Sequence, residues 1–174
     1  MDDPAPSGSP EAGADDPAAA LAEDDRRYRL AFDRAVRLLA QREHSVRELI
    51  AKLAAKGVDA ATAGLVVDDL RGRGLQSDLR FAEAFVHSRV GRGHGPVRIR
   101  QELAQRGIAR DVADEALDGC AERWFELAEA ARRKRFGDAR PADRGDWARQ
   151  ARFLTGRGFP AELIRRVLGD DADA

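Results

Sequence analysis

Apolar residues recur three and four positions apart along most of the chain. Phe32, Ala35, Val36 and Leu39 fall on one helical face, and similar spacings continue through Leu70 and beyond. Such spacings keep side chains on one side of an α-helix, which has about 3.6 residues per turn. Val, Ile and Thr are too scattered to form the alternating pattern of β-strands. The pattern therefore predicts an all-α fold.

A six-residue pattern, L-x-x-[KR]-G-[VIF], occurs at residues 53–58, 103–108 and 154–159. Glycine suits the left-handed position just after a helix, and a preceding base suits the negative end of the helix dipole. The apolar residue that follows can pack back on the leucine. Each copy therefore predicts a helix C-terminus. The structural residues of the three copies are Leu53 and Gly57, Leu103 and Gly107, and Leu154 and Gly158.

Helix starts can be placed in the same units. Residues 45–48 read SVRE, which fits a capping box, and Pro96 follows a glycine where proline favours a first helical position. Asp59 and Pro160 suit the starts of further helices.

Each unit thus reads as helix, helix, glycine stop and helix. We predict three tandem three-helix repeats, over residues 26–76, 77–120 and 121–168, which form an elongated, curved molecule.

Both ends of the chain are acidic, whereas its middle is basic. Residues 1–25 carry eight acidic residues and no Lys or Arg, and residues 169–174 add three more acids. Residues 26–168 hold all 30 basic residues but only 20 of the 31 acidic ones, so a net charge of −1 conceals a body of about +10. We expect a disordered acidic tail over 1–25, a short acidic tail over 169–174, and an anionic partner for the body.

Residues 91–100 read GRGHGPVRIR, a stretch rich in glycine and arginine. A phosphate-binding P-loop would need a Gly-Lys-Ser/Thr ending, and a dinucleotide-binding loop would need a preceding strand. The sequence offers neither. We interpret the stretch as the connection between two helices of the second unit, which serves either as a hinge or as a basic edge that meets an acidic partner.

Residues 77–89 read SDLRFAEAFVHSR and continue through GRGHGPVRIRQEL to QRGI at 105–108, and residues 152–159 read RFLTGRGF. On these residues the chain resembles the RecX family of bacterial recombination regulators, over about residues 32–168. The resemblance implies three three-helix repeats that bind the RecA recombinase filament and inhibit its ATPase and strand exchange. It also implies a role in regulating DNA repair and the SOS response, without a catalytic site. The acidic N-terminal segment is not part of the shared pattern.

Basic residues in the second and third units are the candidate contacts to the RecA filament or to DNA. Glu102 lies one helical turn from both Arg98 and Arg106 and can pair with either, which leaves other arginines nearby without a local carboxylate. We therefore expect Arg89, Arg92 and Arg100 to contribute most. The whole candidate set is Arg89, Arg92, Arg98, Arg100, Arg106, Arg132, Lys134 and Arg135.

A helical DNA-binding module that acts without a recombinase is the alternative. Three-helix units with basic second helices are superficially similar to helix-turn-helix domains. However, no helix carries the cluster of Asn, Gln, Ser and Arg expected for reading base edges. Single- or double-stranded DNA stays open as a further partner.

Other chemistry finds little support in the sequence. His44, His87 and His94 have no cysteine or carboxylate at metal-ligand spacing, and Cys120 is the only cysteine. We expect no metal, no cofactor and no enzymatic activity. No apolar run reaches the roughly 18 residues of a membrane span, so we expect a cytoplasmic protein without membrane association. We also expect a monomer.

Overall fold

The computed structural model describes residues 17–169, which form helices joined by short turns. In chain order the α-helices are α1 (Pro17–Leu39), α2 (Val46–Ala54), α3 (Ala60–Gly72), α4 (Asp78–Val90), α5 (Pro96–Gln105), α6 (Arg110–Asp118), α7 (Trp124–Phe136), α8 (Arg144–Arg157) and α9 (Ala161–Leu168). A short 3₁₀ helix, η1 (Ala121–Arg123), precedes α7. No strand occurs between residues 17 and 169, which confirms the predicted all-α class.

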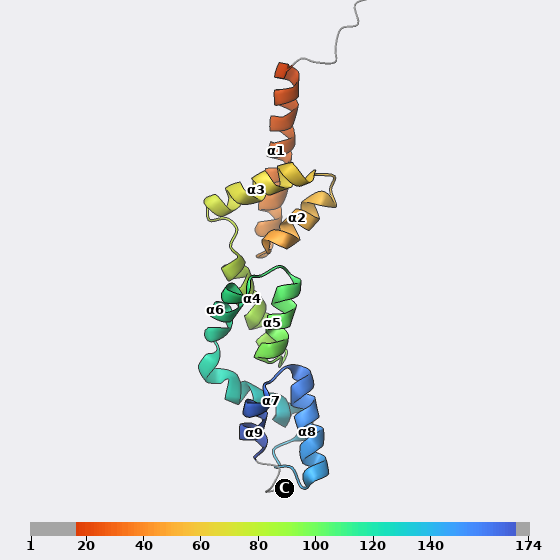
Figure 1. Ribbon diagram of the computed structural model, residues 1–174, viewed down its shortest axis with the longest axis vertical. Helices are drawn as coiled ribbons and strands as arrows, with labels where there is room; N and C mark the ends of the chain where they lie inside the picture. The colour runs from red at the N-terminus through yellow and green to blue at the C-terminus, as the bar shows by residue number, and fades with distance from the viewer. Residues whose placement is uncertain (1–16, 170–174) are drawn as a thin grey trace, which may run out of the picture.

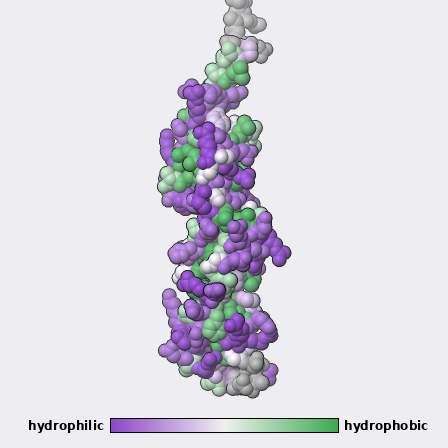
Figure 2. Space-filling model, turned by 90° about the vertical axis from the view of Figure 1, so that its left-hand side faces the viewer, coloured by the Kyte–Doolittle hydropathy of each residue, from purple (hydrophilic) through white to green (hydrophobic). Residues whose placement is uncertain are grey.

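Each successive group of three helices forms a repeat around its own apolar core. The first core gathers side chains such as Ala35, Leu53 and Leu70 from α1, α2 and α3, respectively. The second lies among α4, α5 and α6, and the third among α7, α8 and α9. The three repeats follow one another along the longest axis, so the molecule is elongated (Figure 1). On the face shown in Figure 2, hydrophilic side chains predominate and hydrophobic ones form separate patches.

The first helix starts earlier than the sequence predicted. Helix α1 begins at Pro17, so the expectation of a disordered tail over residues 1–25 is wrong for residues 17–25. Alanine-rich sequence favours a helix, and the exposed ion pairs Glu23–Arg27 and Asp25–Arg29 join residues one turn apart. Residues 1–16 and 170–174, which carry the other expected tail positions, lie outside the described residues.

The three glycines of the repeated pattern end their helices as predicted. Gly57 and Gly107 have a φ of +81°, and Gly158 has a φ of +90°. In each case the backbone N–H of the residue directly after the glycine donates to the carbonyl of the leucine. For example, the Val58 N–H donates to the Leu53 carbonyl at 3.2 Å. This is the backbone arrangement of a Schellman motif, in which a left-handed residue lets the chain satisfy the last carbonyls.

Gly93 ends α4 in the same way, which resolves the conformation of the GRGHG stretch. Its φ is +74°, its N–H donates to Val90 at 2.8 Å, and the N–H of His94 donates to the Arg89 carbonyl at 3.1 Å. Gly95 then precedes Pro96 at the start of α5. The stretch is therefore a helix stop followed at once by a helix start.

The second helices of the repeats meet head to tail. At the junction of repeats one and two, the Ser45 hydroxyl donates to the Arg106 carbonyl at 2.9 Å, and Arg47 Nη1 donates to the Gln105 carbonyl at 3.2 Å. The N-terminus of α2 thus receives the C-terminal carbonyls of α5. Because N-termini carry unpaired donors and C-termini unpaired acceptors, each satisfies the other.

The junction of repeats two and three has the same polarity but uses backbone groups. The N–H of Gly95 donates to the Arg157 carbonyl at 2.8 Å, and the N–H of Val97 donates to the Gly158 carbonyl at 3.0 Å. The start of α5 therefore receives the end of α8. The two junctions place α2, α5 and α8 in one column along the molecule (Figure 1).

Candidate partner-binding groove

A groove of about 330 Å³ lies where the end of α4 faces α7 and α8. Its cationic residues are Arg92, Lys134, Arg135 and Arg157. Its apolar lining includes Val90, Leu127, Ala131 and Phe153. The groove thus combines residues from repeats two and three that lie more than 30 positions apart in the sequence.

Among residues 17–169, no acidic residue lines this groove. Among the described residues, the exposed side chains of Arg92 and Lys134 form no hydrogen bond or ion pair. Arg157 donates to the Arg92 carbonyl at 3.0 Å, and its guanidinium lies 5.2 Å from the centre of the Phe153 ring. Cations gathered without a carboxylate partner attract anionic groups, and the attraction weakens as salt rises. The groove is therefore suited to an anionic ligand.

The chain positions the groove through its glycines. Gly93 turns the backbone after α4 and itself lines the groove, and a Cβ at this position would lie 3.7 Å from the Cβ of Ala131 in α7. Gly95 is closer still to repeat three, because a Cβ built there would overlap the Gly158 carbonyl. The two backbone hydrogen bonds at this junction fix the position of Arg92 relative to α7.

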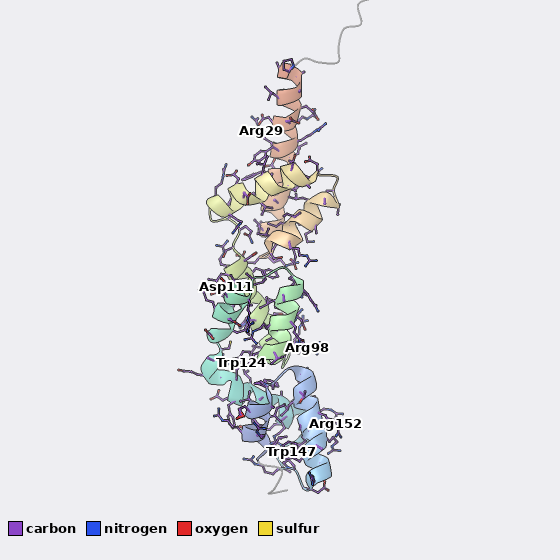
Figure 3. The ribbon with its side chains drawn as sticks, viewed as in Figure 1. Arg29, Arg98, Asp111, Trp124, Trp147 and Arg152 are labelled. Atoms are coloured by element: carbon purple, nitrogen blue, oxygen red, sulfur yellow. The ribbon has the colours of Figure 1, made fainter. Side chains whose placement is uncertain are left out.

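Other predicted contacts are engaged within the protein. Arg89 Nε lies 2.6 Å from Glu102 Oε2, and Arg98 Nε lies 3.0 Å from Glu102 Oε1. Arg100 Nε lies 2.6 Å from Asp114 Oδ1 on α6. Arg89 and Arg100 have no carboxylate one helical turn away, as expected, but each pairs with a carboxylate 13 or 14 residues away. Figure 3 places Arg98 at the end of α5 nearest to repeat three.

Glu102 is surrounded by cationic and imidazole groups. Burial opposes its ionisation, but hydrogen bonds from Arg89 and Arg98 outweigh burial and lower the pKa of the carboxyl below its ordinary value. His94 Nδ1 lies 3.7 Å from Glu102, too far for a hydrogen bond, and has no hydrogen-bond partner among residues 17–169. Burial, followed by the charge of Arg98, lowers the pKa of His94.

Arg106 joins repeats rather than facing a partner. Its Nη1 donates to the Glu102 carbonyl at 2.7 Å, and its guanidinium lies 4.5 Å from the centre of the Phe85 ring. Its Nε also lies 3.8 Å from Glu48 Oε1 in repeat one. These contacts hold the base at the end of its own helix, as its place before Gly107 predicted.

Arg132 is not available to a partner. Only 3% of the residue is exposed. Its Nη1 donates to the Ala139 carbonyl at 2.8 Å and lies 3.5 Å from Gln150 Oε1, while Nη2 lies 3.4 Å from the Asp138 carbonyl. Its expected role in binding was therefore wrong. Instead, it holds the connection between α7 and α8.

The burial of Arg132 follows from its place in the repeat. In the first helix of each repeat (α1, α4 and α7), a buried alanine is followed four residues later by a second buried residue. These second residues are Ala35, Val86 and Arg132. Four residues before the structural leucines of the second helices stand Leu49, Ile99 and Gln150, which are also buried. The third repeat thus replaces two apolar core residues with a polar pair. A run of bases in the sequence conceals this substitution.

The structure brings Arg92 together with Lys134 and Arg135, and adds Arg157, which we did not count among the binding residues. Arg157 occupies the basic position of the repeated pattern, as do Lys56 and Arg106. That recurrence was the available signal. Within the described part of the chain, no cluster of three or more His, Cys, Asp or Glu could hold a metal ion. None of the described helices is long and apolar enough to cross a membrane.

Sequence comparison finds the three domains of one family in order along the chain. The matches are to "RecX, first three-helix domain" over residues 31–70, "RecX, second three-helix domain" over 77–117 and "RecX, third three-helix domain" over 121–168.

Curated relatives and solved structures agree with these matches. "Regulatory protein RecX" of Halorhodospira halophila is 52% identical over 133 residues, which cover 76% of this chain and 83% of the relative. The protein of the same name from Acidithiobacillus ferrooxidans is 49% identical over 135 residues, 78% of this chain and 86% of the relative. A structure titled "Crystal structure of regulatory protein RecX" aligns with a TM-score of 0.78 at 23% identity, covering 91% of this chain and 81% of the other. RecX from Lactobacillus salivarius aligns with a TM-score of 0.71 at 18% identity, covering 86% and 99%. These two structures support the fold.

Proposed function

Because this chain belongs to the RecX family of regulatory proteins, we propose that it binds the filament of the RecA recombinase and inhibits its ATPase and strand exchange. In this proposal the protein acts in the cytoplasm by binding and carries out no reaction of its own. The observation that carries the proposal is the basic groove between repeats two and three, which offers cations with no carboxylate among its lining residues.

The elongated shape also supports a filament as the partner. A chain of repeats presents a long surface, and a filament presents its protomers at regular intervals. Within the groove, Arg92, Lys134, Arg135 and Arg157 would meet carboxylates of the recombinase or phosphates of the DNA inside it. Arg89, Arg98 and Arg100 would act indirectly, since Glu102 and Asp114 already engage them.

The test is the triple substitution Arg92→Glu, Lys134→Glu and Arg135→Glu. We expect inhibition of the RecA ATPase to weaken by about tenfold or more, because several cations are reversed in one contact. The matched control reverses Arg26, Arg123 and Arg152, three exposed arginines that do not line the groove. Figure 3 shows Arg152 on α8, pointing away from the ribbon.

The control should inhibit within about threefold of the parent, and all three proteins should melt at similar temperatures, since surface changes rarely shift stability by more than about 0.5 kcal/mol. If the groove variant is folded and inhibits as strongly as its control, the groove is not the contact. A protein that inhibits the ATPase only at concentrations where it also coats DNA would instead favour the DNA-binding alternative.

A further inference from the structure

A second basic groove, of about 350 Å³, lies in repeat one between the C-terminal half of α1 and the end of α2. Arg34 and Arg37 of α1 stand on one side, and Lys52 of α2 and Lys56 of the turn after it stand on the other. All four residues are exposed. The nonpolar side chains of Leu38 and Leu53 form the floor between the two rows of cations.

The charges of this groove are not balanced within the protein. Within the described part of the chain, no acidic residue lines it. Arg34 Nη1 reaches only the Lys56 carbonyl, at 3.4 Å, and among residues 17–169 the side chains of Arg37, Lys52 and Lys56 form no hydrogen bond or ion pair. By contrast, bases such as Arg89 and Arg100 have a carboxylate within 4 Å. Unbalanced cations on both sides of an aliphatic floor indicate a ligand that is anionic at its edges and apolar at its centre.

The lining of the groove argues against two occupants. Single-stranded nucleic acid is held largely by stacking on aromatic side chains, and no aromatic residue lines this groove. The chain's own residues 1–16 carry five acids, but their only nonpolar side chains larger than alanine are Met1 and three prolines. That segment therefore lacks a leucine, isoleucine or valine to contact the floor.

From the two rows of cations and the floor we propose that the repeat-one groove binds an acidic protein segment that inserts a leucine-like side chain. The carboxylates of the segment contact Arg37, Lys52 and Lys56, and its apolar side chain covers Leu38. This site is separate from the groove between repeats two and three. The inference is independent of the recombinase proposal, because its test contains no recombinase.

The probe is a fluorescein-labelled, 12-residue peptide of Asp and Glu with two central leucines, titrated with the full chain at low salt and followed by fluorescence anisotropy. The groove variant carries Arg37→Gln, Lys52→Gln and Lys56→Gln. The control, with an equal loss of charge, carries Arg26→Gln, Arg123→Gln and Arg152→Gln. We expect affinity about tenfold lower for the groove variant and within about threefold of the parent for the control. Replacing the two leucines of the peptide by serine should weaken binding to the parent by about tenfold or more.

Four results would overturn the proposal. Equal binding by the groove variant and the control would show that the peptide binds elsewhere. Equal binding of the leucine and serine peptides would show that the floor plays no part. Binding of a 12-nucleotide oligo-dT that is lost only in the groove variant, with no binding of the peptide, would assign the groove to nucleic acid. In a last experiment the five acids of residues 1–16 are neutralised in the full chain. If the affinity for the peptide then rises by about tenfold or more, residues 1–16 compete for the groove and are its occupant instead.

Discussion

The two junctions between repeats share one geometry and differ in the groups that form it. At the first junction, side chains of Ser45 and Arg47 reach the carbonyls at the end of α5. At the second, the backbone N–H groups of Gly95 and Val97 reach the end of α8 directly. The absence of a side chain at Gly95 lets the backbones approach more closely than Ser45 does at the first junction.

The difference shows how the same end-to-end packing of repeats can tolerate added side-chain atoms at one junction and exclude them at the other. The first junction is widened by side chains, and Asp78 Oδ1 also accepts from the Val46 N–H at 3.0 Å and from Gln76 Nε2 at 2.8 Å. Flexible side chains can adjust. The second junction leaves no room for a Cβ at Gly95 or Gly158. Because this second junction also builds the basic groove, its tight fit positions the proposed contact residues.

The largest effect should come from Gly95→Ala and Gly158→Ala. At Gly95 the added methyl group overlaps the Gly158 carbonyl, and at Gly158 it overlaps Arg98, so each should lower the free energy of unfolding by more than about 2 kcal/mol. Gly57→Ala should cost about 1 kcal/mol, because it meets no atom within 4 Å and only its φ of +81° resists a side chain. Urea unfolding measures all three.

Gly107→Ala provides the intermediate case. Its Cβ would lie 3.0 Å from Arg47 Cβ and Cδ; the outer part of the arginine can rotate away, but its Cβ moves only with the backbone. We expect a loss between those of Gly57→Ala and Gly95→Ala. If Gly95→Ala is no more destabilising than Gly57→Ala, the second junction is not the tighter one.

A smaller effect should come from Ser45→Ala at the first junction. Ser45 accepts from the Glu48 N–H at 3.1 Å as a helix cap and donates across the junction to Arg106. Ser77 caps α4 through the Arg80 N–H at 3.2 Å and, among the described residues, its side chain forms no hydrogen bond across a junction, so Ser77→Ala is the matched control. We expect about 1 kcal/mol more loss of unfolding free energy for Ser45→Ala than for Ser77→Ala. Equal losses in urea unfolding would mean that the junction bond contributes nothing.

A still smaller effect should follow from Arg100→Gln. Its ion pair with Asp114 is partly exposed and should contribute about 0.5 kcal/mol or less to stability. Inhibition of the recombinase ATPase should stay within about twofold of the parent, since the pair holds α5 against α6 and lies outside the groove. A strong loss of inhibition without a loss of melting temperature would restore Arg100 as a direct contact.

Local patterns predicted the architecture well. The glycine stops at Gly57, Gly107 and Gly158 and the caps at Ser45 and Asp59 depend on residues within one helical turn, and all five have the predicted conformation or cap. The ends of helices are determined by nearby residues, so one sequence was sufficient to find them.

Non-local pairing was beyond the sequence. Arg89 and Arg100 had no carboxylate one helical turn away, yet helix packing brings Glu102 and Asp114 to them. Arg132 stood in a run of bases typical of an exposed face and is buried instead. Aligning the repeats by their core positions, rather than reading the run alone, would have exposed Arg132 as the counterpart of Val86.

The smallest effect concerns the loss of stability in acid. Each junction contains a histidine just before the helix that starts there: His44 before α2 at the first junction and His94 before α5 at the second. Burial lowers the pKa of both His44 and His94, so the folded protein disfavours the charged form of each. Above the ordinary value of about 6.5, both folded and unfolded chains hold neutral histidine and stability is complete. As the pH falls through that value, the unfolded chain takes up the proton more readily, and stability is lost.

The two histidines should differ in how much they contribute to this loss. His44 Nδ1 lies 3.0 Å from Glu48 Oε2, a hydrogen bond that opposes the fall in its pKa. The His94 side chain has no hydrogen bond among residues 17–169; besides burial, the charges of Arg98, Arg157 and Arg89 lower its pKa, and Glu102, 3.7 Å away, only partly opposes them. His94→Gln should therefore reduce the drop in melting temperature between about pH 7.5 and 5.5 more than His44→Gln does, by about 2 °C or less. The exposed His87→Gln serves as the control for simply removing a histidine. If the drop in melting temperature with falling pH becomes smaller only in His44→Gln, the comparison is reversed and the acid-sensitive contact lies at the first junction.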